Sequence, residues 1–148
     1  MDANRLDQIH IIKQTIRNSQ KAGRESLSHE DWACLSRKAQ ECVMALDQWQ
    51  SAREVLLYSA FNKETDTALL RDDALSRGIR VLMPRCKPGE QGCMDLACIS
   101  CKEDLIPGQY GIPEPDPSTC TSLEFFSPDI AVIPGVAFDH QGNRLGWG

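Results

Sequence analysis

Apolar residues recur at helical spacing in the first third of the chain. Residues 9–22 contain isoleucines at positions 9, 12 and 16 and neither glycine nor proline, which predicts a helix with a narrow apolar stripe. A second helix is expected to begin after Ser28, whose hydroxyl can cap it, and to continue to Trp49. Its predicted buried face consists of Trp32, Leu35, Ala39, Val43, Leu46 and Trp49.

Compact apolar runs then predict strands buried in a sheet. They cover residues 54–61, 79–84 and 128–135, with a shorter candidate over 93–100. Between the first two runs, Thr65 or Asp66 can cap a helix that continues to about Arg77 and stops at Gly78. This order is a βαβ unit with parallel strands and a right-handed crossover. The pattern predicts a single α/β domain over 1–148 with a mostly parallel sheet and ligand chemistry at its strand ends.

The segment 103–120 carries four of the eight prolines. Proline fixes φ and removes a backbone donor, so this segment has little capacity to form a helix. We expect an ordered loop with a fixed path over the surface, a setting in which functional residues are common.

Composition limits the possible partners. The chain has 148 residues, 41% of them hydrophobic and 25% charged, as in one soluble globular domain. Its formal charge of −5 argues against a surface adapted as a whole to nucleic acid or an anionic membrane, because such surfaces are basic. It has no apolar run of about 18 residues and no apolar signal-peptide core. We expect no nucleic-acid or membrane partner, and a location in the cytoplasm or an organelle matrix.

Seven cysteines offer a metal or redox alternative. Cys93, Cys98 and Cys101 have a spacing that occurs in plant-type iron–sulfur proteins, with Cys120 as a fourth candidate ligand. However, residues 94–99 have the pattern of a strand, and five extended residues span about 17 Å, which would hold Cys93 and Cys98 far apart. We interpret the cysteines as small apolar thiols, reduced by default. Iron or zinc analysis of the purified protein decides between the two interpretations.

Three polar features stand out from the apolar scaffold. Lys13 and Arg17 are four residues apart and share one face of the first helix. Glu64 and Asp66 follow the end of the first buried strand, where open α/β sheets bind ligands. The segment DHQGNRLGWG at 139–148 can form a turn and expose backbone N–H groups to an anion. Each feature alone fits an ordinary surface, but together they can converge on phosphates and a polar organic substrate.

The sequence resembles the 5-formyltetrahydrofolate cyclo-ligase family, whose members are also called 5,10-methenyltetrahydrofolate synthetases. The strongest likeness is PGVAFDHQGNRLGWG at 134–148, because members typically read PG-hydrophobic-AFD-x-x-G-x-RLG-x-G. Weaker family patterns are matched in the same order by KQTIR at 13–17, LSHED at 27–31, KETDT at 63–67, MPR at 83–85 and YGIPEP at 110–115. The resemblance therefore extends over nearly the whole chain.

The resemblance implies a fold and a reaction. The fold is a three-layer α/β arrangement with helices flanking a mostly parallel sheet, the cyclo-ligase fold, which is similar to that of NagB and RpiA proteins. The reaction is the ATP- and Mg²⁺-dependent closure of 5-formyltetrahydrofolate to 5,10-methenyltetrahydrofolate, with release of ADP and phosphate through a phosphorylated formyl intermediate. We expect a monomer whose partner is this small-molecule substrate.

The resemblance also implies two sets of binding residues. The ATP site consists of Lys13, Arg17, Arg144, Leu145, Gly146, Trp147 and Gly148. The substrate site consists of Ser59, Glu64, Trp147 and Gly148, with the ring of Tyr110 expected to pack on the folate. These residue types suit the chemistry because phosphoryl transfer requires mainly positioning and positive charge. No catalytic residue is assigned.

The chain departs from the family pattern in two places. Lys63 stands where members have glycine, and Thr65 where they have an aliphatic residue. The Gly-Tyr-Tyr-Asp segment of the family, with its Mg²⁺-binding aspartate, is not found before or at Gly148. We therefore expect a chain shortened at its C-terminus and inactive alone. The alternative is a non-catalytic short form that binds folate or nucleotide.

Overall fold

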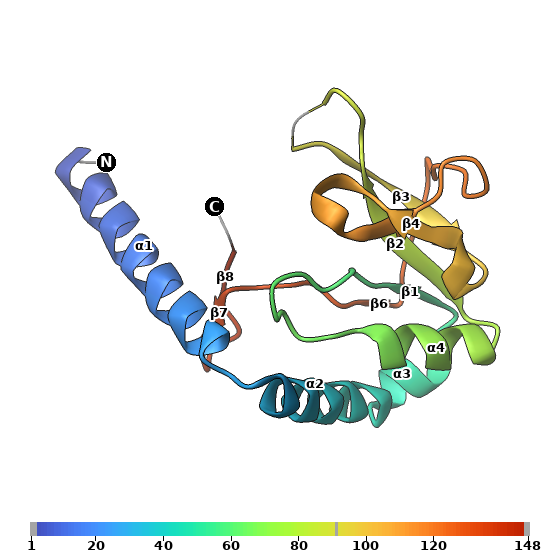
Figure 1. Cartoon of the computed structure of the whole chain (residues 1–148), viewed down its shortest axis with the longest axis horizontal. Helices are drawn as coiled ribbons and strands as arrows, with labels where there is room; N and C mark the ends of the chain where they lie inside the picture. The colour runs from blue at the N-terminus through green and yellow to red at the C-terminus, as the bar shows by residue number, and fades with distance from the viewer. Residues whose placement is uncertain (1–2, 91, 147–148) are drawn as a thin grey trace.

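The computed structural model describes residues 3–90 and 92–146 of the chain. The helices are α1 (Ala3–Glu25), α2 (His29–Met44), α3 (Asp47–Ser51), α4 (Ala68–Ser76) and the short 3₁₀ helices η1 (Lys102–Asp104) and η2 (Gln109–Gly111). The strands are β1 (Glu54–Leu56), β2 (Arg80–Cys86), β3 (Met94–Ile99), β4 (Leu105–Pro107), β5 (Pro113–Pro115), β6 (Ile130–Ala131), β7 (Ala137–Phe138) and β8 (Arg144–Leu145). Figure 1 shows α2, α3 and α4 side by side beneath the central strands.

The central sheet has the strand order β3-β2-β1-β6. β1 pairs in parallel with both β2 and β6, whereas β2 and β3 are antiparallel. Because α4 connects β1 to β2, the predicted βαβ unit and mostly parallel sheet are confirmed. β1 and β6 are shorter than predicted, since the chain leaves the sheet after Leu56 and Ala131. β2 instead continues past Pro84, because β3 pairs with it as far as Cys86.

The expected second helix is two helices. Ser28 is its cap as predicted, because its Oγ accepts the N–H of Asp31 at 3.0 Å. The expectation of a helix unbroken to Trp49 is wrong, since α2 ends at Met44 and α3 begins at Asp47. Trp49 is still fully buried.

The most buried residues of helix α2 are polar, and only part of the predicted apolar face, such as Val43, packs against the core. Ser36 and Gln40 are buried, whereas Leu35 is exposed. The Oε1 atom of Gln40 accepts the N–H groups of Leu69 and Leu70 at 2.9 and 3.4 Å. These groups belong to the first turn of α4, whose N–H groups lack partners within the helix. A polar side chain is therefore needed where α2 meets α4.

The ends of α4 follow the sequence prediction. The Oδ1 atom of Asp66 accepts the N–H groups of Thr67 at 2.8 Å and Ala68 at 3.1 Å, which stabilises the helix start. Gly78 follows the last turn with φ of +71°, a left-handed conformation that glycine adopts without strain.

The hydrophobic core lies around the central sheet, α3 and α4. Its buried members include Trp49, Val55, Leu57, Leu70, Ala74, Ile79, Val81, Met83, Ala97 and Ile99. They come mainly from the predicted strands and from one side of α4, so the βαβ unit and β3 form the rigid base of the molecule.

The segment 103–120 is more ordered than the predicted loop. It contains an antiparallel hairpin in which Leu105 pairs with Pro115 and Pro107 with Pro113. The prolines are compatible with this pairing because they lie on a two-stranded sheet with two open edges. β5 packs against β2 and β3, so the hairpin covers part of the base.

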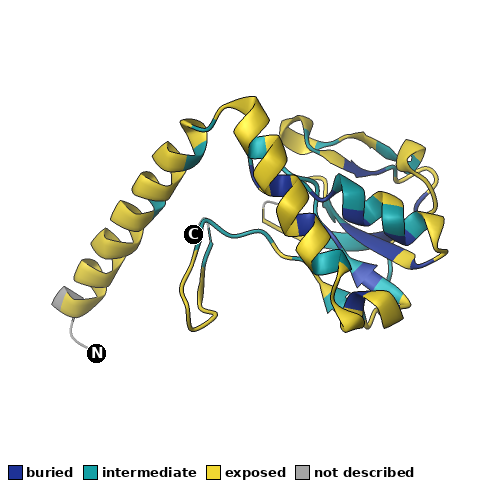
Figure 2. Ribbon diagram, turned by 90° about the horizontal axis from the view of Figure 1, so that it is seen from below, coloured by how far each residue is buried: buried dark blue, intermediate teal, exposed yellow. Residues whose placement is uncertain are grey.

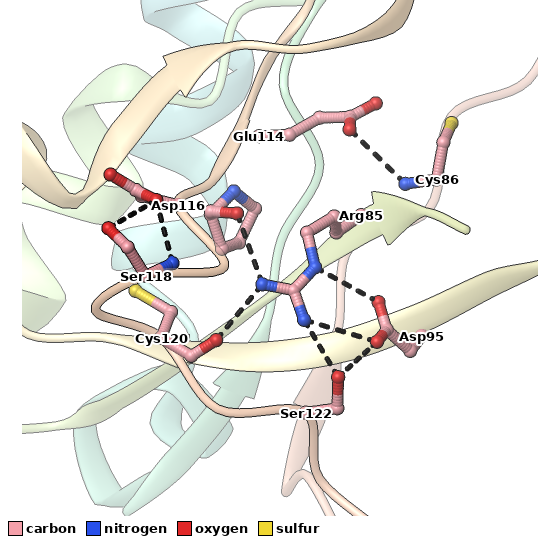
Figure 3. A network of polar contacts seen from close by, with 9 residues as sticks. Arg85, Cys86, Asp95, Glu114, Asp116, Ser118, Cys120 and Ser122 are labelled. Carbon is pink, nitrogen blue, oxygen red and sulfur yellow. Dashed lines mark hydrogen bonds and ion pairs between the residues drawn. The ribbon is translucent and has the colours of Figure 1, made fainter. Parts of the chain in front are cut away.

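Arg85 joins this covering segment to the sheet (Figure 3). Its Nε and Nη2 atoms donate to the carboxylate of Asp95 at 3.3 and 3.1 Å. Its Nη1 atom donates to the carbonyl oxygens of Cys120 at 2.9 Å and Pro115 at 3.3 Å. Nη2 also donates to the hydroxyl of Ser122 at 2.7 Å. One guanidinium therefore links β2, β3 and the chain after β5, and we call this group the Arg85 clamp.

Helix α1 extends away from the rest of the molecule, and most of its surface is exposed (Figures 1 and 2). The predicted stripe of Ile9, Ile12 and Ile16 is among the exposed residues. The β7–β8 hairpin contacts α1. Among the described residues, no helix is both long and apolar enough to cross a membrane.

Candidate functional site

The site begins with a tight turn at 61–64, shortly after the chain leaves β1 at Leu56. The N–H of Glu64 donates to the carbonyl of Phe61 at 3.0 Å, and the N–H of Phe61 donates back to Oε2 of Glu64 at 3.0 Å. Asn62 and Lys63 between them have φ values of +47° and +56°. Two successive non-glycine residues in the left-handed region indicate a strained turn. This turn holds the side chain of Glu64, a residue that is only 8% exposed.

Aromatic side chains fix the turn from two sides. Trp32 on α2 donates from Nε1 to the carbonyl of Glu64 at 2.8 Å. Tyr58 donates its hydroxyl to the carbonyl of Thr65 at 2.6 Å. Burial, followed by the negative charges of Glu64 and Asp66, raises the pKa of Tyr58 to about 12. Tyr58 therefore stays a hydrogen-bond donor at physiological pH.

Three of the predicted substrate residues line one cavity of about 490 Å³. Ser59 and Glu64 lie on the chain that follows β1, and Tyr110 lies in η2, far from both in sequence. The rest of the lining is largely apolar and includes Phe61, Pro84, Met94, Ile112, Pro113 and Pro134. A cavity of this size with few polar groups has the character of a small-molecule site.

The β4–β5 hairpin forms one wall of this cavity. Ser59 donates its hydroxyl to the carbonyl of Pro113 at 2.6 Å, which joins the end of β1 to β5. Tyr110 has φ of +62° and its side chain is 74% exposed, so its ring stands at the mouth of the cavity. Its exposed face is able to stack on a flat ring.

Glu114 and Cys86 also line the cavity, and neither was a predicted site residue. Glu114 is buried, and its Oε2 atom accepts the N–H of Cys86 at 3.2 Å (Figure 3). Burial, and then the hydrogen bond and charge of Glu114, raise the pKa of the Cys86 thiol. Glu114 lies in the YGIPEP segment, so the motif was visible, but its contact with β2 depends on the hairpin fold.

We expect Cys86 to be alkylated more slowly than the exposed Cys34 near neutral pH, because only the thiolate reacts readily. The alkylation rate of Cys86 should continue to rise above pH 8.5, which is about the ordinary pKa of a thiol. Mass spectrometry of peptides after timed treatment with iodoacetamide measures both rates. Equal labelling of Cys86 and Cys34 at neutral pH would contradict the environment described for Cys86.

Arg17, one of the predicted phosphate-binding residues, contacts the segment that carries Arg144, which is another of them. Arg17 on α1 donates from Nε to the carbonyl of Gly146 at 2.9 Å. Arg144 donates from Nη1 to the carbonyl of Pro134 at 3.1 Å. Leu145 pairs with Ala137 in the β7–β8 hairpin. The structure therefore brings Arg17 to the segment that carries Arg144, as the sequence pattern suggested.

The remaining predicted residues are less closely placed. Lys13 is exposed on α1, one turn before Arg17. The predicted turn at 139–142 is confirmed, since the N–H of Gly142 donates to the carbonyl of Asp139 at 3.1 Å. Trp147 and Gly148 lie outside the described residues.

A second cavity of about 520 Å³ separates α1 from the chain after β6. It is lined on one side by Gln20 and Arg24 of α1 and on the other by residues 132–136. Glu64 lines this cavity as well as the first one. The buried carboxylate therefore stands between the apolar cavity and the side of the molecule that carries the basic residues.

The cysteines do not gather in the part of the chain that the structure describes. β3 forms over Met94–Ile99, as predicted, and this extended segment lies between Cys93 and Cys101. Within residues 3–90 and 92–146, no group of three or more His, Cys, Asp or Glu side chains is placed to hold a metal ion.

Comparison with known proteins gives a consistent family. Residues 10–148 match the model of the 5-formyltetrahydrofolate cyclo-ligase family. A Schizosaccharomyces pombe protein named "Probable 5-formyltetrahydrofolate cyclo-ligase" is 31% identical over 109 residues, covering 72% of this chain and 52% of that protein. The 5-formyltetrahydrofolate cyclo-ligase of Escherichia coli (strain K12) is 27% identical over 125 residues, covering 84% of this chain and 69% of the relative. The chain thus spans about half the length of the first relative.

A solved structure shows the same fold. The NMR structure of Aquifex aeolicus 5,10-methenyltetrahydrofolate synthetase matches with a TM-score of 0.73 and 26% sequence identity. The match covers 93% of this chain and 68% of that one. The predicted α/β cyclo-ligase fold is therefore confirmed.

Proposed function

This chain belongs to the 5-formyltetrahydrofolate cyclo-ligase family, and from that premise we propose that its site binds 5-formyltetrahydrofolate and ATP for an ATP-dependent ring closure. The products are 5,10-methenyltetrahydrofolate, ADP and phosphate. The observation that carries the proposal is the position of Glu64, whose buried carboxylate lines both the apolar cavity and the cavity beside α1.

The chemistry explains why two adjoining subsites are needed. The formyl oxygen is a poor leaving group, so it takes the γ-phosphoryl group of ATP, and ADP leaves. N10 of the folate then attacks the activated formyl carbon and the ring closes. N10 gives up its proton, the bond from the formyl carbon to the phosphorylated oxygen breaks, and the released phosphate carries that proton away as hydrogen phosphate. The protein supplies positioning and positive charge, which are the main demands of phosphoryl transfer.

The apolar cavity is the folate subsite in this proposal. A carboxylate accepts hydrogen bonds only, so Glu64 suits the N–H-rich edge of a pterin ring. Tyr110 stacks on the flat rings at the cavity mouth, and Ser59 holds β5 in place as the opposite wall. The largely apolar lining removes water from the reacting groups.

The basic residues around α1 form the nucleotide subsite. Lys13, Arg17 and Arg144 provide charges and donors that match phosphate oxygens. Arg17 contacts the backbone of Gly146, which follows Leu145 at the end of β8. Trp147 and Gly148 complete the proposed contacts with both ligands. Mg²⁺ would arrive with the phosphates of ATP, where it neutralises charge.

We expect Lys13→Ala and Arg144→Ala each to raise the KM for ATP by about 10- to 100-fold, because each removes a charge-assisted contact of about 1.5–3 kcal/mol. The KM for the folate should change by less than about twofold. Steady-state formation of the methenyl chromophore measures both constants, and calorimetric binding replaces it where turnover is slow. Lys38→Ala removes a charge from the exposed surface of α2 and is the matched control.

The same measurements discriminate between the enzyme and a binding protein. Formation of the methenyl chromophore only in the presence of both MgATP and 5-formyltetrahydrofolate supports the proposed reaction. Saturable binding of both ligands without product favours the non-catalytic alternative. Unchanged ATP affinity in both charge variants would remove the phosphate-site assignment.

A further inference from the structure

Lys63 occupies a backbone conformation that favours glycine, and its side chain makes a contact that glycine lacks. Its φ is +56° and follows a φ of +47° at Asn62. Its Nζ atom donates to the carbonyl oxygen of Glu25 at 3.1 Å and to that of Leu27. The unusual residue at this turn therefore reaches about forty residues back in the chain, to the end of α1.

One of these carbonyl groups belongs to the last residue of α1, and the other, that of Leu27, lies in the link to α2. α1 ends at Glu25, and the last carbonyl groups of a helix lack partners within it and carry the negative end of its dipole. A lysine ammonium can satisfy such groups. Since most of α1 is exposed and extends away from the base, this contact fixes the end of the helix from which the chain continues into α2 (Figure 2).

The residue next to Lys63 is the buried carboxylate of the site. Glu64 is held by the N–H of Phe61 through its side chain and by Trp32 through its carbonyl. Lys63 also lines the cavity beside α1, together with Glu64. A shift of α1 would therefore pull on the same four-residue turn that sets the position of Glu64.

We propose that Lys63 is a positioning residue that couples nucleotide binding on α1 to folate binding at Glu64. The identity of the two ligands rests on the proposed function above. Lys13 and Arg17 lie on α1, so phosphates bound to them restrict the orientation of the helix. Lys63 transmits this restriction to the turn, and Glu64 is then held in its binding position. Because coupling is reciprocal, each ligand tightens the other.

The test is a binding cycle on the whole chain. 5-Formyltetrahydrofolate is titrated by calorimetry with and without a non-hydrolysable MgATP analogue, for the wild type and for Lys63→Met, Lys63→Gly and Lys63→Arg. We expect the analogue to tighten folate binding about fivefold or more in the wild type, and less than about twofold in the Met and Gly variants. Lys63→Arg keeps a donor and should retain most of the coupling.

A second readout follows the contact itself. Loss of the Lys63 ammonium should speed amide hydrogen exchange in residues 22–27, and Lys63→Arg should restore the slow exchange. Lys63→Gly suits the left-handed turn, so its loss of coupling cannot come from added backbone strain. Equal coupling in the wild type and Lys63→Met, or no coupling in the wild type, would overturn the inference. A wild type that binds neither ligand would instead overturn the proposed function, and this coupling with it.

Discussion

Arg85→Met is expected to lower the free energy of unfolding by about 3 kcal/mol, since removing one partner of a buried ion pair leaves the other charge uncompensated. The side chains of Arg85 and Asp95 are only 12% and 18% exposed. The substitution also removes the donors of two backbone carbonyl groups, those of Cys120 and Pro115. For a domain of this size the melting temperature should fall by about 6–12 °C. Thermal and urea unfolding followed by circular dichroism measure the change.

Arg80→Met is the matched control for the Arg85 clamp. Arg80 lies on the same strand and forms an ion pair with Glu54 at 2.7 Å, but its side chain is 47% exposed. Exposed pairs contribute about 1 kcal/mol or less, because water and salt screen them. Similar losses of stability in the two variants would show that the clamp adds nothing beyond an ordinary surface ion pair.

The stability that the Arg85 clamp contributes should also depend on pH. Burial alone would raise the pKa of Asp95, but hydrogen bonds from Ser122 and Arg85 and the charge of Arg85 outweigh it and hold the pKa below its usual value. The stabilisation is therefore present above the unfolded pKa of about 3.9 and is lost as pH falls through the lower folded pKa. The gap in stability between the wild type and Arg85→Met should be widest near neutral pH and narrow below about pH 4.

The parts of the fold that depend on neighbouring residues could be predicted from the sequence. The cap at Ser28, the start of α4 at Asp66 and its stop at Gly78 each use side chains or backbone within a few residues of the helix end. The parallel pairing of β1 and β2 follows from the helix between them. Local patterns were sufficient for these elements because their determinants are local.

The parts that were missed depend on contacts between distant segments. Gln40 is buried because the N-terminus of α4 approaches it, about thirty residues away in sequence. The prolines of 103–120 predict no helix, but they do not reveal that Leu105 faces Pro115 in a hairpin. Periodicity cannot supply such contacts, since the same polar residues would be exposed if the partner segment lay elsewhere.

The candidate site shows the same division. The family resemblance selected Ser59 and Glu64, and the aromatic face of Tyr110 made it a candidate; the structure places all three around one cavity. The departure of Lys63 from the family pattern was visible in the sequence, but its reason was not, because the acceptor at Glu25 lies in another helix. Residues that match a motif could be found by resemblance, whereas residues particular to this chain required the fold.

Glu64→Gln is expected to weaken the binding of 5-formyltetrahydrofolate by about 10- to 100-fold. The physical reason is that a neutral amide replaces a carboxylate, and hydrogen bonds to charged groups contribute about 1.5–3 kcal/mol each. The carboxamide of the glutamine also places an NH₂ donor where the proposed ligand has its own N–H donors, so part of the contact becomes repulsive. Calorimetric titration of the folate measures the loss, and affinity for the MgATP analogue alone should stay within about threefold of the wild type.

Glutamine is chosen because it should change the folate contact without changing the stability of the fold. Its side-chain oxygen can still accept the N–H of Phe61, so the turn at 61–64 is retained and the melting temperature should hardly change. Glu64→Ala removes that acceptor too, and should lower both folate affinity and stability, because a buried N–H would lose its partner. Glu124→Gln changes the same charge in an exposed segment and should leave both quantities unaltered. Equal folate affinity in the wild type, Glu64→Gln and Glu124→Gln would show that the carboxylate is not the folate contact. The buried charge of Glu64 would then serve only to order the turn.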